Sequence, residues 1–418
     1  MTADVESFRS AAHDWLSSRL EPRPVEDADG GWGRGVHDVS VFHDLTADDE
    51  RALLDRAMHW QQTKCDAGYG AITWPCEFGG AGLSPRHEEA FREEEDGFVT
   101  PLPHETTSVT ARLIAPTVRI YGTEAQQDRW VRRFLRTDEL CCQLFSEPGA
   151  GSDLAGLATR AVTDGDQWMV NGQKVWSSGA RFAEWGMLVA RTDPDVPKHA
   201  GLTTYIIPMD LSGIEVRPIR QMSGGWSFNE VFLEDVRVDD RYRVGAIGDG
   251  WRVALTTLGL ERGAADQRVG GGIDQALALA RWLGRTADPV LRDRLADLYV
   301  NERITALVHE HMAKAVAAGH DPGAQGSIAK LRWTQDLART SDVVSLLLGP
   351  RLVADTGEWG TYSWSAHVLG APGYRIAGGS DEIQRNILGE RVLGLPPEPR
   401  VDRNVAWRDV PRAIEARR

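Results

Sequence analysis

Cysteine is scarce in this chain of 418 residues, which contains only four. None of the four has the spacing of a zinc site, and Cys141 and Cys142 are adjacent within an apolar run. We therefore expect buried free thiols in a reducing compartment. The N-terminus has neither a basic segment nor an apolar one, so it does not indicate a secretory signal. Together these features predict a cytoplasmic protein.

The chain also lacks an excess of basic residues and any long apolar run. Its formal net charge is -14, whereas nucleic acids and anionic membrane surfaces bind basic faces. No window approaches the roughly 18 consecutive apolar residues that a membrane helix needs. We therefore expect neither nucleic acid nor a membrane as a partner. A local basic pocket for a phosphorylated ligand is compatible with this overall charge.

The order of the sequence patterns predicts an α+β fold. Helical spacing of apolar residues dominates up to about residue 140, and Thr46, Ser84–Pro85 and the capping box of Thr123 with Gln126 supply helix starts. Short apolar runs punctuated by Pro, Gly and Asp follow. Helical spacing then returns. We predict an N-terminal helical domain at 1–139, a central antiparallel β domain at 140–241 and a C-terminal helical domain at 242–418.

Within the β part, Gln167–Val170 and Lys174–Trp176 are predicted to be two short strands joined by a hairpin turn at Asn171–Gly172. The further strands are expected at 187–190, 203–207, 214–216 and 231–238. The C-terminal helices are expected near 250–284, 289–318, 325–356 and 381–394.

Three segments carry residue types suited to a bound ligand. The first, QLFSEPGAGSD at 143–153, has hydroxyls beside glycines, but Leu154 stands where a dinucleotide-binding motif needs a glycine, and a long helix does not follow. Taken alone, a plain turn and a ligand loop are equally good interpretations. The second, GQKVWSSGA at 172–180, is by itself typical of a strand with a core tryptophan. The third, GGSDEIQRNI at 378–387, is by itself typical of a helix start capped by Ser380.

In this order and spacing, the three segments together resemble the acyl-CoA dehydrogenase family. The resemblance extends from about Trp74–Pro75 to Leu395–Pro396, which is most of the chain, and FNEVFLEDVRV at 228–238 resembles the family's end of the β domain. It implies that the C-terminal domain is a four-helix bundle and that FAD lies between the domains and across a subunit interface. It also implies the activity: α,β-desaturation of an acyl-CoA thioester, with flavin N5 accepting the Cβ hydride.

The resemblance assigns roles to individual residues. The positions that it places around FAD are Gln143, Phe145, Ser146, Gly151, Ser152, Trp176, Ser178, Ser380 and Glu382. Among these, Trp176 would pack on the flavin ring, Ser178 would hydrogen-bond near N5, and Ser152 would also contact the pantetheine arm of the substrate. The thioester carbonyl would be polarised by the flavin ribityl hydroxyl and the backbone N–H of Gly378.

The chain departs from the family pattern at the FAD tail. The Arg-x-x-Phe-Gly segment that reaches a neighbouring subunit's FAD is absent, and Arg281 and Arg285 are the candidates to replace it. The paired glycines of the adenine-binding turn appear as Gly349–Pro350.

The catalytic base is the second departure. Many relatives carry a glutamate directly before the Gly-Thr of the third segment, whereas this chain has Gly378 there. Isovaleryl-type dehydrogenases and many actinobacterial relatives supply the base from Leu-x-Leu-Glu-Arg, and the chain reads LGLER at 258–262. The resemblance therefore implies Glu261 as the base and Arg262 beside the substrate, although a lone glutamate on a helix is usually a surface residue.

Two other interpretations stay open. The chain can be a flavin-binding subunit of a heteromeric dehydrogenase, or an oxidase-type or nitroalkane-oxidising flavoenzyme on the same fold. The expected partners are an acyl-CoA or acyl carrier protein thioester, an electron-transfer flavoprotein as electron acceptor, and further subunits in a homo-oligomer or a heterotetramer.

Overall fold

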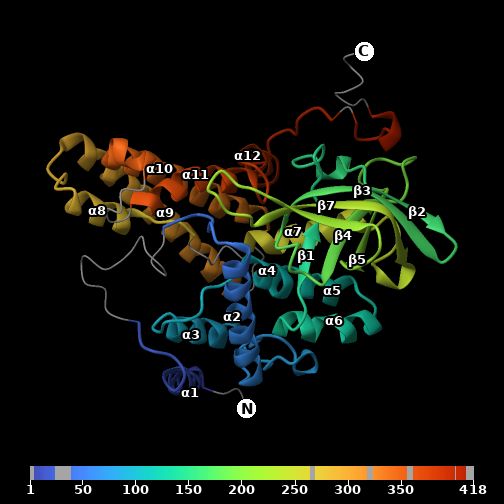
Figure 1. Ribbon diagram of the computed structural model, residues 1–418, viewed down its shortest axis with the longest axis horizontal. Coiled ribbons are helices and arrows are strands. Elements are labelled where there is room, and N and C mark those ends of the chain that lie inside the picture. Colours follow the sequence, from blue (N-terminus) through green and yellow to red (C-terminus); the bar gives the residue numbers. More distant parts are fainter. Residues whose placement is uncertain are drawn as a thin grey trace.

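The computed structural model describes residues 4–23, 39–263, 269–317, 323–354, 361–400 and 402–410, without the side chains of 261–263, 316 and 317. Helices come first, a single sheet follows and helices return (Figure 1). This confirms the predicted α+β class, in which a mainly antiparallel sheet lies between two helical parts along the sequence.

Three of the helices before the sheet begin where the sequence indicated, after Thr46, Ser84 and Thr123, whereas those at 105–108 and 115–121 were not predicted. The helices are α1 (Val5–Ser17), α2 (Ala47–Asp66), α3 (Pro85–Glu95), α4 (Glu105–Ser108), α5 (Ala115–Tyr121) and α6 (Glu124–Arg136). The Thr46 hydroxyl accepts the Asp49 N–H at 3.2 Å, as expected of an N-cap. Ser84 precedes α3 as predicted, but its hydroxyl pairs with the ring of His87 at 2.8 Å instead of capping the backbone. A π-helical segment at Val109–Ile114 joins α4 to α5, so 105–121 is one continuous helix with a wide turn inside it.

The predicted capping box of α6 is confirmed, and one of its residues has a second role. The Thr123 N–H donates to Gln126 Oε1 at 3.0 Å and the Gln126 N–H donates to Thr123 Oγ1 at 3.3 Å. The side-chain nitrogen of Gln126 also donates to the carbonyls of Arg241 and Arg243, at 2.8 Å each. The start of α6 is thereby fixed to the last strands of the sheet.

Eight strands form the sheet. They are β1 (Cys141–Leu144), β2 (Arg160–Asp164), β3 (Gln167–Ser178), β4 (Trp185–Arg191), β5 (Leu202–Pro208), β6 (Ile214–Ile219), β7 (Phe228–Asp239) and β8 (Arg243–Val244). Their order is β6-β7-β3-β2-β4-β5-β8, and β1 pairs with β4. The pairings β1–β4 and β2–β4 are parallel and all the others are antiparallel. Strands β1, β2 and β8 were not predicted as strands.

The predicted hairpin turn at Asn171–Gly172 is wrong. The two short strands are one continuous strand, β3, with a register irregularity between Val170 and Gly172. A Cβ on Gly172 would come 2.3 Å from Thr159 Oγ1, so the glycine allows two strands to approach closely. The turn is at Gly165, whose φ is +68°, in the two-residue loop between Asp164 and Gln167.

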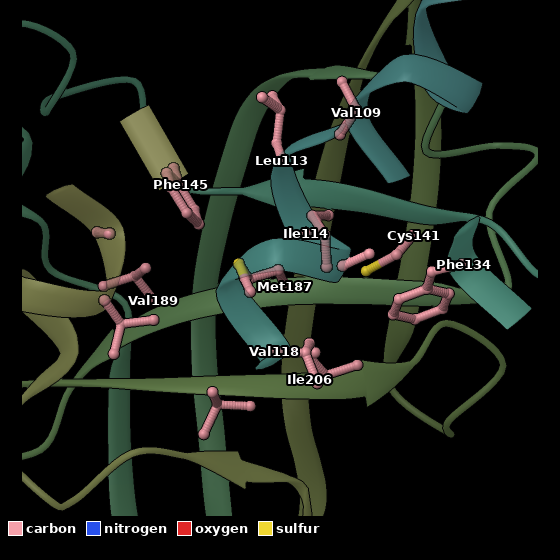
Figure 2. Close-up of a cluster of buried hydrophobic side chains, with 14 of the residues drawn as sticks. Val109, Leu113, Ile114, Val118, Phe134, Cys141, Phe145, Met187, Val189 and Ile206 are labelled. Carbon is pink, nitrogen blue, oxygen red and sulfur yellow. The ribbon is translucent and has the colours of Figure 1, made fainter. Parts of the chain in front are cut away.

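A layer of buried apolar side chains joins the N-terminal helices to the sheet (Figure 2). Its members include Val109, Leu113, Ile114, Val118, Phe134, Cys141, Phe145, Met187, Val189 and Ile206. Alternate residues of β4, Leu188 and Ala190, belong to a second buried cluster on the other face. Because β4 is covered on both faces, its sequence is continuously apolar. Each fully buried apolar side chain contributes about 1.5–3 kcal/mol, so this layer fixes the helix at 105–121 against the sheet.

The C-terminal helices differ from the expected ranges. They are α7 (Gly250–Gly263), α8 (Ile273–Trp282), α9 (Pro289–Ala317), α10 (Gly326–Leu348), α11 (Thr361–Ile376) and α12 (Asp381–Ile387). The predicted helix at 250–284 is two helices, with Gly270 at φ +78° between them. The predicted helix at 325–356 ends at Leu348, because Gly349 has φ +53° and Pro350 follows. Helix α11 was missed, and it contains Pro372, which normally argues against a helix.

The cysteines are free, but the expectation that all are buried is wrong for Cys76, which is exposed, and Cys65 is half-buried. Within the described part of the chain, no helix is long and apolar enough to span a bilayer.

Candidate active site

Two of the three sequence segments lie side by side in the structure. Gln143 is on β1, and Phe145 and Ser146 follow it directly, while the second segment forms the end of β3. The Val175 N–H donates to the Ser146 carbonyl at 3.0 Å. The Lys174 ammonium donates to the Phe145 carbonyl at 3.0 Å. The segments at 143–146 and 176–178, which are assigned to the flavin ring, are therefore neighbours in the fold, although Phe145 itself is buried in the apolar layer.

Trp176 has an unusual backbone conformation for a residue in a strand. Its φ is +62°, within a register irregularity between Lys174 and Ser177, and its side chain is 59% exposed. A left-handed non-glycine residue costs of order 1–3 kcal/mol, and such strain concentrates at functional sites. The indole is not a core side chain, as the segment alone would suggest; its ring lies edge-on to Phe228 at 6.0 Å. The fold thus presents a large flat aromatic surface to the outside.

Several buried polar atoms around this surface have no hydrogen-bond partner within the described chain. They include Gln143 Nε2, Ser177 Oγ and Thr106 Oγ1. Such atoms are costly unless something satisfies them, and they are rare in native proteins. A flat polar heterocycle with carbonyl and ring-nitrogen groups, such as the flavin of FAD, fits donors and acceptors of this kind beside an exposed indole.

A buried ion pair supports the loop after β1. Lys174 is fully buried, and its ammonium donates to Glu147 Oε1 at 2.8 Å and to the Val189 carbonyl at 2.8 Å. Glu147 also accepts the N–H groups of Ala158 and Thr159, at 2.6 and 2.9 Å, so it closes the loop between them. Burial lowers the pKa of Lys174. Burial alone would raise the pKa of Glu147, but Lys174 outweighs it and the pKa lies below its ordinary value. Neither residue was predicted to have a role; a lysine within an otherwise apolar strand was the available signal.

The tip of this loop is open. Gly151 and Ser152 are exposed, and a Cβ placed on Gly149 or Gly151 would meet no atom within 4 Å. Packing within the chain therefore does not require these glycines. Because these glycines have no side chains, the backbone of the loop is accessible to a ligand, which suits the predicted contacts of Ser152.

The third segment forms a rigid turn before α12. Gly378 and Gly379 have φ of +63° and +87°. The buried Gln384 side chain donates to their carbonyls at 2.9 and 3.1 Å, and Lys330 donates to the Gly379 carbonyl at 2.8 Å. The Ser380 hydroxyl accepts the Ile383 N–H at 3.4 Å, as a cap should. Sequence reasoning missed Gln384 and Lys330, which hold this turn.

The next residues divide between the interior and the surface. Asp381 is buried and accepts hydrogen bonds from Arg375 at 2.8 Å and Thr334 at 3.1 Å. Glu382 is exposed, and hydrogen bonds from its own backbone N–H and from Ser380 lower its pKa. Of these two carboxylates, Asp381 stabilises the helix packing, whereas Glu382 is accessible to a ligand, as its predicted FAD contact requires.

Glu261 and Arg262 are in the last turn of α7, but their side chains lie outside the described residues. The direction of the helix is clear from its hydroxyl contacts: Thr257 meets Thr117 at 3.0 Å, and Thr256 meets Tyr121 at 2.9 Å. Helices α7 and α5 are therefore antiparallel. The C-terminal turn of α7 therefore lies toward the Glu105 end of the continuous helix at 105–121.

The arginines proposed for the FAD tail have different positions. Arg285 donates to the carbonyls of Leu346 and Leu347, at 2.8 and 3.1 Å, and pairs with Asp288 at 3.3 Å. It therefore caps the C-terminal end of α10 within its own chain. Arg281 is exposed on α8 and Gly349 forms the left-handed residue after α10.

A cluster of His43, Glu50 and His104 has residue types that bind metals, with ligand atoms within 4.8 Å of one another. His104 Nδ1 accepts the Thr106 N–H at 3.2 Å, so Nε2 must carry the proton, and it lies 3.2 Å from Glu50 Oε1. The other Glu50 oxygen accepts from Arg181. Because the nitrogen of His104 that faces the cluster is a donor, the cluster is an ion-pair network and not a metal site.

Comparison with known proteins agrees with this architecture. Models of the N-terminal, middle and C-terminal domains of acyl-CoA dehydrogenases match residues 41–138, 142–236 and 248–393. The chain is 37% identical over 401 residues to the acyl-CoA dehydrogenase IpdE1 of Mycobacterium tuberculosis, covering 94% of this chain and 99% of the relative.

Among solved structures, the chain is similar to one titled Tcur3481-Tcur3483 steroid ACAD, with a TM-score of 0.74, 27% identity and coverage of 95% and 99% of the two chains. It is also similar to the ChsE4-ChsE5 complex from Mycobacterium tuberculosis, with a TM-score of 0.68, 25% identity and coverage of 95% and 98%. The chain belongs to the acyl-CoA dehydrogenase family, whose members are oxidoreductases with FAD as cofactor.

Proposed function

We propose that the chain catalyses the α,β-desaturation of an acyl-CoA thioester, with Glu261 as the base. The observation that carries this proposal is the exposed, left-handed Trp176 beside the unpartnered polar atoms of Gln143 and Ser177. The residues of 143–146 and 176–178 would hold the flavin ring. Bound FAD supplies the hydride acceptor, which no side chain can provide.

Glu261 would remove the proton from Cα. Gly378 has no side chain and cannot act as the base, and α7 directs its last turn toward the region where the N-terminal helices meet the sheet. A carboxylate held there against a substrate would lose hydration, which raises its pKa toward neutrality and suits proton abstraction.

The turn at Gly378 and Gly379 would polarise the thioester carbonyl. Gln384 and Lys330 hold the carbonyls of Gly378 and Gly379, which fixes the two peptides that directly follow the Gly378 N–H and supports a rigid turn there before a substrate binds. Main-chain N–H groups that are preorganised in this way stabilise a developing oxyanion without reorganisation. The lack of a side chain at 378 does not affect this contribution.

The test is anaerobic reduction of the bound flavin by an acyl-CoA, compared between wild type and Glu261→Gln. The variant keeps the shape of the side chain and removes the base, so bleaching should slow on the order of 10²-fold or more. Glu89→Gln, an exposed change on α3, is the control. Bleaching of Glu261→Gln at the wild-type rate would rule out this base.

For the acyl group, we propose a fused-ring, steroid-like skeleton bearing a side chain with the thioester. The support is the similarity to the structure titled as a steroid ACAD. Wild type should bleach at least tenfold faster with a steroid side-chain CoA thioester than with straight-chain acyl-CoA of equal thioester length. Equal rates with both would contradict this substrate class, and a matching acyl carrier protein thioester would test the carrier.

We further propose that the active form is a heteromer with a homologous second chain. The supporting similarity is to structures described by two chain names. Within this chain, α9 carries exposed Val300, Ile304 and Leu307 at helical spacing, with 52%, 41% and 48% exposure. Such a stripe is typical of a subunit interface. A homo-oligomer with full FAD occupancy would contradict the heteromer.

The oxidase alternative concerns the electron acceptor. We expect slow reoxidation by air and fast reoxidation by an electron-transfer flavoprotein after anaerobic reduction. The reverse order would assign the chain to the oxidase class. The four free cysteines support a reducing, cytoplasmic location.

A further inference from the structure

The C-terminal segment 402–410 lies against the loop between β4 and β5. The family model of the C-terminal domain ends before this segment, which is therefore outside the part of the chain that the model matches. The Trp407 N–H donates to the Val196 carbonyl at 2.9 Å. Next to it, Ala406 forms a β-bridge with Pro197. Main-chain contacts thus attach the segment to the β domain.

The side chain of Trp407 covers a buried arginine. Arg191, the last residue of β4, has its Cζ atom 4.5 Å from the centre of the indole ring. The Arg191 guanidinium donates to the carbonyls of Ala155 and Leu157, at 2.6 and 3.2 Å. The Trp407 Nε1–H donates to the carbonyl of Gly156, which lies between them, at 3.2 Å. Arg191 and Trp407 together hold three consecutive carbonyls of the loop that follows β1.

An ion pair joins the C-terminal segment to the same loop at a second point. The Lys198 ammonium lies 2.5 Å from Asp402 and 2.8 Å from Asp153. Because only 12% of the Lys198 side chain is exposed, this pairing is screened less by water than an ordinary surface ion pair. Asp153 directly follows Ser152, so the residue that is predicted to contact the substrate is next to this attachment.

The contacts divide the loop after β1 into two parts. Its base is fixed from within the sheet, because Glu147 accepts from the Lys174 ammonium and from two loop N–H groups. Its tip, from Gly149 to Ser152, is open to a ligand, and the residues just after the tip are attached to Arg191, Trp407 and Lys198. Loosening the C-terminal segment should therefore free the tip and leave the base, which belongs to the flavin-ring segments, in place.

We propose that the C-terminal segment is part of the thioester site, and that Trp407 is a positioning residue that holds the loop at 151–157 so that Ser152 meets the pantetheine arm of the CoA thioester. This inference rests on the proposed function, which makes a CoA thioester the substrate. Trp407 needs no contact with the substrate, since it acts through Arg191 and the loop carbonyls. A loop that is ordered before binding has less entropy to lose on binding, so the affinity for CoA rises.

The test is calorimetric titration of the FAD-loaded enzyme with S-propyl-CoA. This thioether contains the whole CoA part, but it has no carbonyl to make a carbon acidic, so no turnover occurs. Trp407→Ala should weaken its binding on the order of 10-fold, because one neutral hydrogen bond and one cation–π contact are lost. Trp407→Phe keeps a ring over Arg191 and loses only the hydrogen bond, so its loss should be about threefold.

Trp282→Ala is the matched control. It truncates a tryptophan that is 47% exposed on α8, on the opposite side of the molecule from the C-terminal segment (Figure 1). Its affinity for S-propyl-CoA should equal that of wild type. Equal affinity in wild type and Trp407→Ala would overturn the proposal.

FAD content and turnover separate positioning from a merely structural role. In Trp407→Ala, FAD content and kcat should stay within about twofold of wild type, because Glu147 and Lys174 still hold the base of the loop. KM for a thioester that the enzyme oxidises should rise in parallel with the dissociation constant of the probe. Loss of FAD, or a fall in kcat at unchanged KM, would show a structural role only and would overturn the proposal.

Wild type supplies a second test, which stands even where Trp407→Ala does not fold. Coupling between two sites is reciprocal, so saturating S-propyl-CoA should slow tryptic cleavage after the exposed Arg403 by a factor similar to the affinity change. Cleavage at an unchanged rate would overturn the proposal. Wild type that binds no S-propyl-CoA would refute the proposed substrate class, and this inference with it. Probe binding that weakens in Trp407→Ala, in an enzyme that oxidises no acyl-CoA, would refute only the proposed reaction.

Discussion

Replacing Lys174 with methionine removes the positive charge from a fully buried ion pair while it keeps most of the side-chain volume. The ammonium donates to Glu147 Oε1 at 2.8 Å, to the Phe145 carbonyl at 3.0 Å and to the Val189 carbonyl at 2.8 Å. After the change, two carbonyls and a carboxylate lose this donor. Removing one partner of a buried pair costs about 3–5 kcal/mol, so we expect the free energy of unfolding to fall by about that amount.

The loss of unfolding free energy in Lys174→Met should depend on pH. In wild type, Lys174 holds the pKa of Glu147 below its ordinary value of 4.5. Without the lysine, burial leaves the folded pKa of Glu147 above that of the unfolded chain, so the carboxyl takes up a proton on folding. A group whose pKa is raised by folding contributes stability at low pH that is lost as the pH rises through the folded value. The variant should therefore lose less stability at about pH 5 than at about pH 8.

Urea unfolding, followed by tryptophan fluorescence, measures both quantities. The 15 tryptophans of the chain report its overall unfolding. The double variant Lys174→Met/Glu147→Gln should recover at least about 1–2 kcal/mol of the single loss, because it removes the unpaired charge. A cost below about 1 kcal/mol for Lys174→Met, or a cost independent of pH, would refute the reasoning.

Three further changes test other parts of the molecule. Trp176→Gly should relieve the left-handed backbone and leave unfolding within about 1 kcal/mol of wild type, while FAD titration should show at least tenfold weaker binding; unchanged affinity would separate the indole from the cofactor. Glu50 contributes stability above its ordinary pKa of 4.5 that is lost as the pH falls through its lowered pKa, so acid unfolding of Glu50→Gln should show a flatter low-pH limb than wild type, and identical limbs would contradict the ion-pair network. Leu307→Glu, 48% exposed in wild type, should dissociate the oligomer in light scattering without altering circular dichroism; an intact assembly would place the interface elsewhere.

Local chemistry was readable from the sequence at two helix starts, although the hydroxyl of Ser84 bonds to His87 and does not cap its helix. The Thr46 cap and the Thr123–Gln126 box are hydrogen bonds over three residues, so residue type and spacing suffice. The predicted turn at Gly172 was wrong because the sequence does not distinguish a glycine that allows close approach to Thr159 from a glycine in a turn. Helix α11 was missed because Pro372 and its glycines are unfavourable locally and tertiary packing outweighs them.

For the candidate site, the sequence supplied the segments but not their arrangement. The hydrogen bond between Val175 and Ser146 that joins two of them depends on the sheet pairing, and the left-handed Trp176 depends on an irregularity in that pairing. The roles assigned to individual residues came from the family resemblance and, like the domain boundaries, stay predictions.

The double use of Gln126 limits which residues evolution can place there. Glutamate and glutamine serve equally well in a helix capping box. Here, however, the amide nitrogen faces the carbonyls of Arg241 and Arg243, and a carboxylate oxygen in its place would face two acceptors with no hydrogen to offer. Replacing Gln126 with glutamate, which is conservative within a helix, would therefore weaken the contact between α6 and the end of the sheet. A substitution table built from isolated helices would not show this cost.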